Sequence, residues 1–183
     1  MKDIYMEKFK QNVKIINIGE YYATGKQEGI ATVLGSCISA CIFEEGGGIG
    51  GMNHFLVPGD FRDEEIFLSP VARYGMFAME LLMGELIKLN VDRHRLKAKV
   101  FGGADMPHTS SSNSVGQNNI RFIKTFLKME GIPIVSSDLG GTAARKLFFF
   151  PQSGKVMVKR ISQNINKIVT LEDQFHKKAQ LEL

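Results

Sequence analysis

The stretch that decides the fold spans residues 30–58 and reads IATVLGSCISACIFEEGGGIGGMNHFLVP. Its first apolar segment ends at Gly35 and Ser36, a second begins at Cys37, and a glycine run separates that segment from a third, which carries His54. Apolar segments joined by glycines are typical of a β-hairpin, so the third segment is expected to run antiparallel to the second. Cys37 and His54, 17 residues apart, can then lie side by side across the pair.

This pairing has a chemical use. Cysteine is a nucleophile only as its thiolate, and histidine is the usual neighbour that removes the thiol proton near neutral pH. Thr32 is the nearest polar residue able to hold the imidazole in one tautomer, but in a continuous strand it would face away from Cys37. It can serve only if the chain bends at Gly35, and such a bend would also free backbone N–H groups for an oxyanion hole.

Two other interpretations of these residues stay open. Free cysteine is often simply buried in the core, and Cys41, which lies among apolar neighbours, fits that interpretation well. Alternatively Cys37, Cys41 and His54 bind zinc, although a structural zinc site normally has four protein ligands and no fourth is evident. A nucleophile that acts on a folded protein must be reachable, so the catalytic interpretation predicts that Cys37 is exposed at the surface.

The motifs around these residues resemble a known family. Thr32-x-Leu-Gly-Ser-Cys37 is followed by Gly50-Gly51-Met-x-His54-x-x-x-Pro58, and further matching motifs lie at residues 98–106, 115–119 and 138–146. In this order, over roughly residues 13–160, they are similar to the signature of the chemoreceptor glutamine deamidase family, CheD.

The resemblance implies a cysteine hydrolase that deamidates glutamines in the cytoplasmic helical region of methyl-accepting chemotaxis receptors. It implies that Cys37 is the nucleophile, His54 the base and Thr32 the orienting residue. Such a mechanism needs one nucleophile, one base and a few N–H donors, so no cofactor and no metal are expected. The resemblance also implies a partner, a CheY-phosphatase of the CheC type. A non-catalytic adaptor that binds a receptor or such a phosphatase is the remaining alternative.

Composition sets the outer limits. A chain of 183 residues can bury about 70% of its unfolded surface and fold without metal or disulfide support. Its two cysteines, four residues apart on a strand, are separated by about 13 Å, too far for a disulfide, and no secretory leader precedes them. Reduced thiols predict a cytoplasmic protein. No apolar run is long enough to span a membrane, so no membrane insertion is expected. The basic residues are not clustered, so no nucleic-acid binding is expected.

The chain is predicted to alternate strands and helices. Helices are expected from Ser69-Pro70 to Asn90, over 118–130, and in the tail from residue 161. Strands are expected at 13–18, 97–101, 132–135, 146–150 and 156–159, besides the hairpin, whereas 20–29 is expected to be loop. The glycines at 46–51 match G-x-G-x-x-G, but an extended segment follows them, so dinucleotide binding is rejected. The loop at 104–114 holds Asp105 and His108, which could border an active site.

These elements predict an α+β fold in a single domain. Strands outnumber helices, which favours mixed or antiparallel sheets flanked by helices, and the family resemblance implies the same layered sandwich. The predicted organisation is an N-terminal arm at 1–12, helical or loose, a cysteine hydrolase domain at 13–160, and a C-terminal helical extension at 161–183.

Overall fold

A computed structural model of the chain describes residues 1–57, 69–70, 72–106, 115–161 and 165–181. Two five-stranded sheets form its centre. The first sheet has the order β1 (Lys2–Met6), β2 (Gln11–Ile15), β4 (Gly29–Leu34), β9 (Ala144–Phe150) and β10 (Lys155–Ile161). The second has the order β3 (Tyr21–Thr24), β6 (Gly50–Asn53), β5 (Ile38–Glu44), β7 (Leu96–Gly102) and β8 (Ile134–Leu139).

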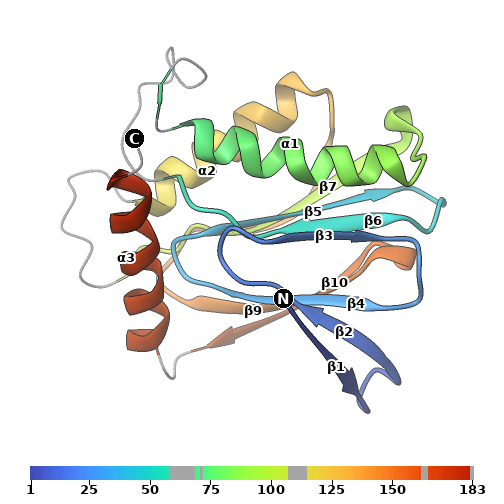
Figure 1. Cartoon of the computed structure of the whole chain (residues 1–183), viewed down its shortest axis with the longest axis horizontal. Coiled ribbons are helices and arrows are strands. Elements are labelled where there is room, and N and C mark those ends of the chain that lie inside the picture. Colours follow the sequence, from blue (N-terminus) through green and yellow to red (C-terminus); the bar gives the residue numbers. More distant parts are fainter. Residues whose placement is uncertain (58–68, 71, 107–114, 162–164, 182–183) are drawn as a thin grey trace.

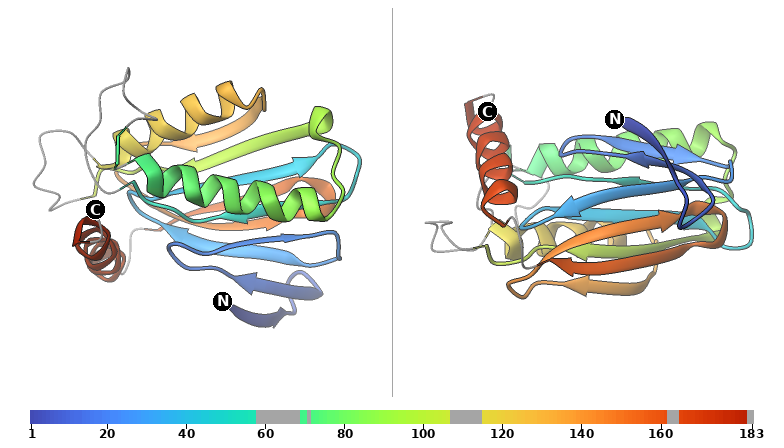
Figure 2. Two further views of the ribbon diagram at one scale, coloured as in Figure 1. Left: turned by 45° about the horizontal axis from the view of Figure 1, so that its top comes forward. Right: turned by 90° about the horizontal axis from the view of Figure 1, so that it is seen from below.

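The helices cover the second sheet and one end of the molecule. α1 (Ala72–Lys88) and α2 (Val115–Met129) lie along the outer face of the second sheet, whereas α3 (Ile165–Leu181) stands across the strand ends (Figures 1 and 2). One apolar core lies between the second sheet and helices α1 and α2, and another lies between the two sheets. A third, smaller cluster lies beneath α3. The predicted α+β sandwich is confirmed.

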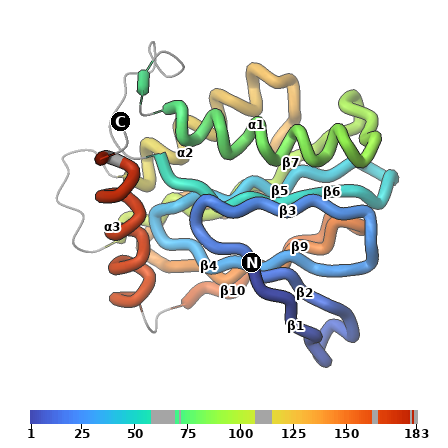
Figure 3. The backbone as a smooth tube through the Cα atoms, viewed as in Figure 1, coloured from blue at the N-terminus to red at the C-terminus, as the bar shows by residue number. Residues whose placement is uncertain are grey.

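The chain changes sheets between β4 and β5. β4 pairs with β2 and β9 in the first sheet, and β5 pairs with β6 and β7 in the second, so residues 35–37 make the crossing. We call these three residues the bend. Figure 3 follows the chain as it leaves β4, turns beside α3 and enters β5. The bend predicted at Gly35 and Ser36 is confirmed, and it exists because the two adjoining strands belong to different layers.

The predicted hairpin is also present. β5 and β6 are antiparallel, and beyond β6 the backbone of Phe55 exchanges two hydrogen bonds of 2.9 Å with Ile38. Because side chains alternate along a strand, Cys37 and His54 both lie on the face opposite to Ile38 and Phe55. That face lies between the sheets, and the two residues are diagonal neighbours on it.

Several expected elements differ from the structure. The first residues form strand β1, which pairs with β2, so neither a helix nor a loose arm is present there. Residues 20–29 contain strand β3, which was expected to be loop and pairs with β6 at the edge of the second sheet. The strand expected at 132–135 begins at Ile134 and continues to Leu139, beyond its expected end. These errors share a cause, because short or edge strands take their hydrogen bonds from distant partners and carry weak local patterns.

The other expected elements are confirmed with small shifts of their ends, α2 for example beginning at Val115 rather than at residue 118. The glycine run joins β5 to β6 and opens no helix. His108 lies outside the described residues, and the domain boundaries at 12/13 and 160/161 stay a prediction.

A glycine of β7 supports the bend directly. Gly102 has φ +112°, and a Cβ atom added there would overlap the carbonyl oxygen of Cys37. We expect Gly102→Ala to lower the free energy of unfolding by about 3 kcal/mol or more, because the backbone of the bend would have to move. The matched control is Gly48→Ala, at φ +74° with no described atom within 4 Å of the added carbon, and its expected cost is about 1 kcal/mol. Urea unfolding followed by circular dichroism measures both, and equal costs would contradict a close packing of Gly102 against the bend.

Candidate active site

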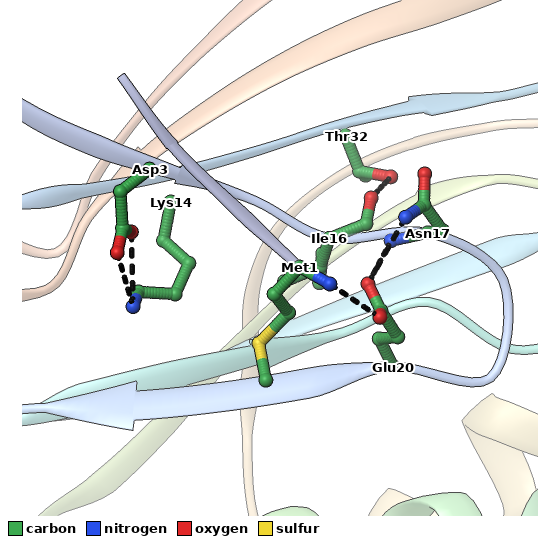
Figure 4. Close-up of polar contacts among 7 residues, drawn as sticks. All are labelled: Met1, Asp3, Lys14, Ile16, Asn17, Glu20 and Thr32. Atoms are coloured by element: carbon green, nitrogen blue, oxygen red, sulfur yellow. Dashed lines mark hydrogen bonds and ion pairs between the residues drawn. The ribbon is translucent and has the colours of Figure 1, made fainter. Parts of the chain in front are cut away.

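Thr32 and His54 form a buried hydrogen bond. The hydroxyl oxygen of Thr32 lies 2.8 Å from Nδ1 of His54. The same hydroxyl donates to the backbone carbonyl of Ile16 at 2.8 Å, the bond that Figure 4 shows. Thr32 is on β4 of the first sheet and His54 directly follows β6 of the second. The bond therefore joins the two layers.

The loop between β2 and β3 holds the backbone of His54. The N–H of Gly19 donates to the carbonyl of His54 at 2.8 Å, and the N–H of His54 donates to the carbonyl of Glu20 at 3.0 Å. Figure 4 shows how this loop is held in turn: the carboxylate of Glu20 accepts from the backbone and side chain of Asn17 and pairs with the N-terminal amino group. The imidazole is thus positioned by main-chain contacts on both sides as well as by Thr32.

These contacts determine the tautomer of His54. A threonine hydroxyl has a single proton, and Thr32 gives it to the carbonyl of Ile16, so Nδ1 of His54 must be the donor in the second bond. Burial lowers the pKa of His54 from 6.5 to about 3, which keeps the ring neutral at physiological pH. Nε2 therefore has a free lone pair, and it is a buried atom without a hydrogen-bond partner among the described residues. This is the state required of a general base.

Cys37 lies near the imidazole of His54. Its Sγ, a ring nitrogen of His54 and a carboxylate oxygen of Glu172 all lie within 4.8 Å of one another. Since Nδ1 is held by Thr32, Nε2 is the nitrogen available to the thiol. The structure therefore brings together Cys37, His54 and Thr32, as expected from the sequence.

The bend supplies a set of oriented N–H groups. Its three carbonyl oxygens accept, in chain order, from the N–H of Ala104 at 2.9 Å, Nδ2 of Asn119 at 2.8 Å and the N–H of Gly103 at 2.8 Å. The buried amide of Asn119 is itself held by the N–H of Val57 at 2.7 Å. With the carbonyls held on this side, the N–H groups of the bend are free to bind an anion on the other.

The N–H groups of the bend bind the side chain of Glu172 on α3. Its Oε1 accepts from the N–H of Gly35 at 2.9 Å and of Cys37 at 3.3 Å. Its Oε2 accepts from the N–H of Ser36 at 2.8 Å and from the Ser36 hydroxyl at 2.7 Å. Gly35 makes room for the carboxylate, because a Cβ atom there would lie 2.9 Å from Oε2. The bend thus binds a carboxylate beside Cys37.

Cys37 itself is fully buried, so the expected exposure at the surface is wrong. Burial raises the pKa of its thiol well above 9.0, and the negative charge of Glu172 and a hydrogen bond with it raise it further. In this arrangement the sulfur is a neutral thiol next to a neutral base. The chemical parts are assembled, but the nucleophile is not activated.

The structure does not gather the ligands proposed for zinc. Cys41 is buried in the core between the sheets, and burial raises the pKa of its thiol. Among the described residues, the group that could hold a metal ion is Cys37, His54 and Glu172. Both oxygens of Glu172 already accept hydrogen bonds from the bend, and N–H donors around a carboxylate favour an anion there over a cation.

Two residues of this site were not singled out from the sequence. Asn119 belongs to the motif at 115–119, but its contact with the bend crosses 83 residues. Glu172 lies 135 residues beyond Cys37, in the segment expected only to be a C-terminal helical extension. A charged residue within the apolar pattern of α3 was the signal for Glu172, since buried carboxylates need hydrogen-bonding partners.

The chain is similar to known proteins. The model of the family described as CheD chemotactic sensory transduction matches residues 57–160. The chain is 45% identical over 177 residues to the probable chemoreceptor glutamine deamidase CheD of Janthinobacterium sp. (strain Marseille), a match that covers 96% of this chain and 87% of the relative. It belongs to the CheD family. The protein of the same name from Herminiimonas arsenicoxydans is 44% identical with the same coverage, and that of Laribacter hongkongensis (strain HLHK9) is 40% identical over 88% of this chain and 78% of its own.

The family likeness extends over α3. The family model ends at residue 160, but the match to the Janthinobacterium relative takes in 96% of the chain, and so includes both Cys37 and the segment that carries Glu172. In the part of the chain that the structure describes, no helix has the length and apolar character needed to cross a membrane.

Burial of His54 has a consequence for stability. In the unfolded chain His54 takes up a proton below pH 6.5, whereas in the folded protein it stays neutral down to about pH 3. Its contribution to stability is therefore complete above pH 6.5 and is lost as the pH falls toward 3. Between about pH 6 and pH 4, the free energy of unfolding of the wild type should fall more steeply than that of His54→Gln, by up to about 1.4 kcal/mol per pH unit.

Urea unfolding at several pH values measures this difference. The control is His94→Gln, at an exposed histidine of the same chain, which should leave the slope of the wild type unchanged. A His54→Gln variant with the same pH slope as the wild type would contradict the neutral, buried state of the imidazole.

Proposed function

We propose that this chain deamidates glutamine side chains of methyl-accepting chemotaxis receptors, and that Cys37 is the nucleophile, His54 the general base and acid, and Thr32 the positioning residue. The observation that carries the proposal is the hydrogen bond from Nδ1 of His54 to Thr32, which leaves Nε2 unprotonated beside Cys37. The names of the CheD relatives, probable chemoreceptor glutamine deamidases, supply the substrate.

The first half of the reaction forms a thioester. Nε2 of His54 takes the proton of Cys37 as Sγ attacks the carboxamide carbon of a glutamine. The oxygen of that carboxamide becomes negatively charged, and the N–H groups of the bend are placed to stabilise it. The carbon–nitrogen bond then breaks, and the imidazolium returns its proton to the departing ammonia.

The second half hydrolyses the thioester. Water attacks the same carbon, Nε2 takes a proton from it, and the sulfur leaves as the thiol of Cys37. The products are a glutamate side chain and ammonia, so atoms balance with water as the only co-reactant. A carboxylate bound to the bend, as Glu172 is here, has the chemistry of this product.

The partners follow from the same proposal. The substrate is the cytoplasmic helical region of a receptor, which would place this protein in the cytoplasm and requires no membrane insertion, nucleic acid, cofactor or metal. A CheY-phosphatase of the CheC type is a second proposed partner, which rests on the family resemblance alone.

A non-catalytic adaptor is the competing function, and the buried, neutral thiol of Cys37 favours it. The two functions differ in one product. An adaptor binds a receptor fragment and releases no ammonia, whereas a deamidase releases one ammonia for each glutamine converted.

Mass spectrometry of a receptor cytoplasmic fragment tests the nucleophile. Wild-type protein should add about one dalton at each glutamine converted to glutamate, and Cys37→Ala should abolish that gain because no other group forms the thioester. Cys41→Ala is the matched control, since Cys41 is equally buried on the strand that follows Cys37 but lies outside the cluster of Cys37 and His54. Loss of activity in both variants, or in neither, would rule out the assignment of Cys37.

Thr32 offers a test of positioning. Thr32→Val keeps the shape of the side chain but cannot accept the Nδ1 proton, so we expect kcat to fall about 100-fold with KM little changed. Thr32→Ser keeps the hydroxyl and should restore most of the activity. A purely structural role would lower the melting temperature and affect both variants alike, so the contrast in kcat between valine and serine is the decisive readout.

A further inference from the structure

α3 buries a single charged residue among those that the structure describes. Its inward residues follow helical spacing and are apolar except for one: Ile165, Ile168, Val169, Glu172, Phe175 and Ala179. Glu172 is only 5% exposed. A buried carboxylate is costly unless its oxygens are bonded, and here it accepts bonds from three backbone N–H groups and one hydroxyl. The helix thus delivers one carboxylate to the bend.

Glutamate is also the chemical product of glutamine deamidation. Oε1 accepts hydrogen bonds from the N–H groups of Gly35 and Cys37, where the carbonyl oxygen of a substrate carboxamide would be polarised. Oε2 lies on Ser36, at the position from which ammonia would leave. The distances are those of a bound ligand, and the missing Cβ of Gly35 provides the space that it fills.

The surface beneath α3 is otherwise incompletely filled. A cavity of about 740 Å³ separates the helix from the ends of β2 and β4, and its lining includes Thr32 and His54 together with Ile168 and Phe175. The small apolar cluster under the helix is formed on the other side by Ala104, Met106 and Ala144. α3 is therefore held by few apolar contacts and by the carboxylate of Glu172. Another helix with apolar residues at the same spacing and a suitable polar side chain at the same position can replace it.

We propose that the surface under α3 is the binding site for the substrate helix, and that α3 occupies it as a product mimic that keeps the enzyme closed. The partner is an amphipathic receptor helix that presents a glutamine where α3 presents Glu172, with apolar residues four positions before and three after it, as Ile168 and Phe175 are placed here. This inference rests on the proposed function and specifies its substrate and its regulation.

The closed state agrees with the condition of Cys37. The carboxylate of Glu172 raises the pKa of the thiol in addition to burial, and the thiol is not exposed. Removal of α3 takes away that negative charge and frees the N–H groups of the bend for the oxygen of a substrate. Binding of a receptor helix and departure of α3 are therefore the same step.

The substitution Glu172→Gln turns the product mimic into a substrate. The carboxamide oxygen can take the place of Oε1, and its NH₂ group can donate to the Ser36 hydroxyl, with loss of the bond from the Ser36 N–H. Cys37 would form a thioester with the carboxamide carbon of residue 172 and release ammonia, and water would then restore the thiol and leave glutamate. The protein would thereby convert its own residue 172 back to glutamate.

Mass spectrometry of the tryptic peptide 168–177 measures this conversion. We expect residue 172 in purified Glu172→Gln to gain about one dalton, at a rate independent of protein concentration, because the reaction is intramolecular. Gln174 lies in the same peptide and is exposed, so it is the internal control and should stay unchanged. The double variant Cys37→Ala with Glu172→Gln should show no gain.

A second measurement examines the closed state. Glu172→Ala removes the carboxylate, so we expect iodoacetamide to label Cys37 about tenfold faster than in the wild type and receptor deamidation to rise. Lys177→Ala, at an exposed residue of the same helix that does not line the cavity, should leave both rates unchanged. Circular dichroism checks that each variant is folded.

The outcomes separate this inference from the proposed function. If residue 172 of the Glu172→Gln variant stays a glutamine and Glu172→Ala leaves labelling unchanged, while the receptor fragment is still deamidated, α3 is not a product mimic and the deamidase proposal stands. If neither the wild type nor Glu172→Ala deamidates the receptor fragment, the deamidase proposal itself fails. Conversion of the substituted residue 172 only when Cys37 is present, together with deamidation of the receptor fragment, would establish both.

Discussion

The crossing of the chain from one sheet to the other at residues 35–37 is the constraint on which the rest of the site depends. Strand β4 belongs to the first sheet and β5 to the second, so the backbone between them must turn out of both ladders. Its carbonyl groups then bond to Gly103, Ala104 and Asn119, and its N–H groups point to the opposite side. A single feature thus places Cys37, creates the anion-binding N–H groups and brings Thr32 within reach of His54.

Electrostatics set the protonation of both His54 and Cys37. Burial keeps His54 neutral with an open Nε2, which suits a base, but burial and Glu172 together keep Cys37 protonated, which does not suit a nucleophile. The bend stabilises negative charge, and in this structure the charge that it stabilises is a carboxylate from the same chain. In the proposed mechanism, access of the substrate and activation of the thiol both depend on α3, which carries this carboxylate.

The parts of this arrangement that the sequence predicts are the local ones. The glycine run predicts the hairpin, and Gly35 predicts the bend. Because side chains alternate along a strand, Thr32 can reach His54 only if the chain bends. Strands β1 and β3 were missed because they are short, lie at sheet edges and are specified by β2 and β6 rather than by their own residues. The burial of Cys37 was missed because the carboxylate beside it comes from a helix 135 residues away, which no local pattern assigns to the site.

Nuclear magnetic resonance of the histidine side chains tests the central claim most directly, namely that Thr32 holds a neutral imidazole with its lone pair toward Cys37. A long-range ¹H–¹⁵N spectrum reports which ring nitrogen carries the proton, and His54→Gln identifies the signals of His54 among the four histidines. The account predicts a neutral ring protonated at Nδ1 that does not titrate between about pH 8 and pH 5. A ring protonated at Nε2, or one that titrates near its ordinary pKa, would contradict it.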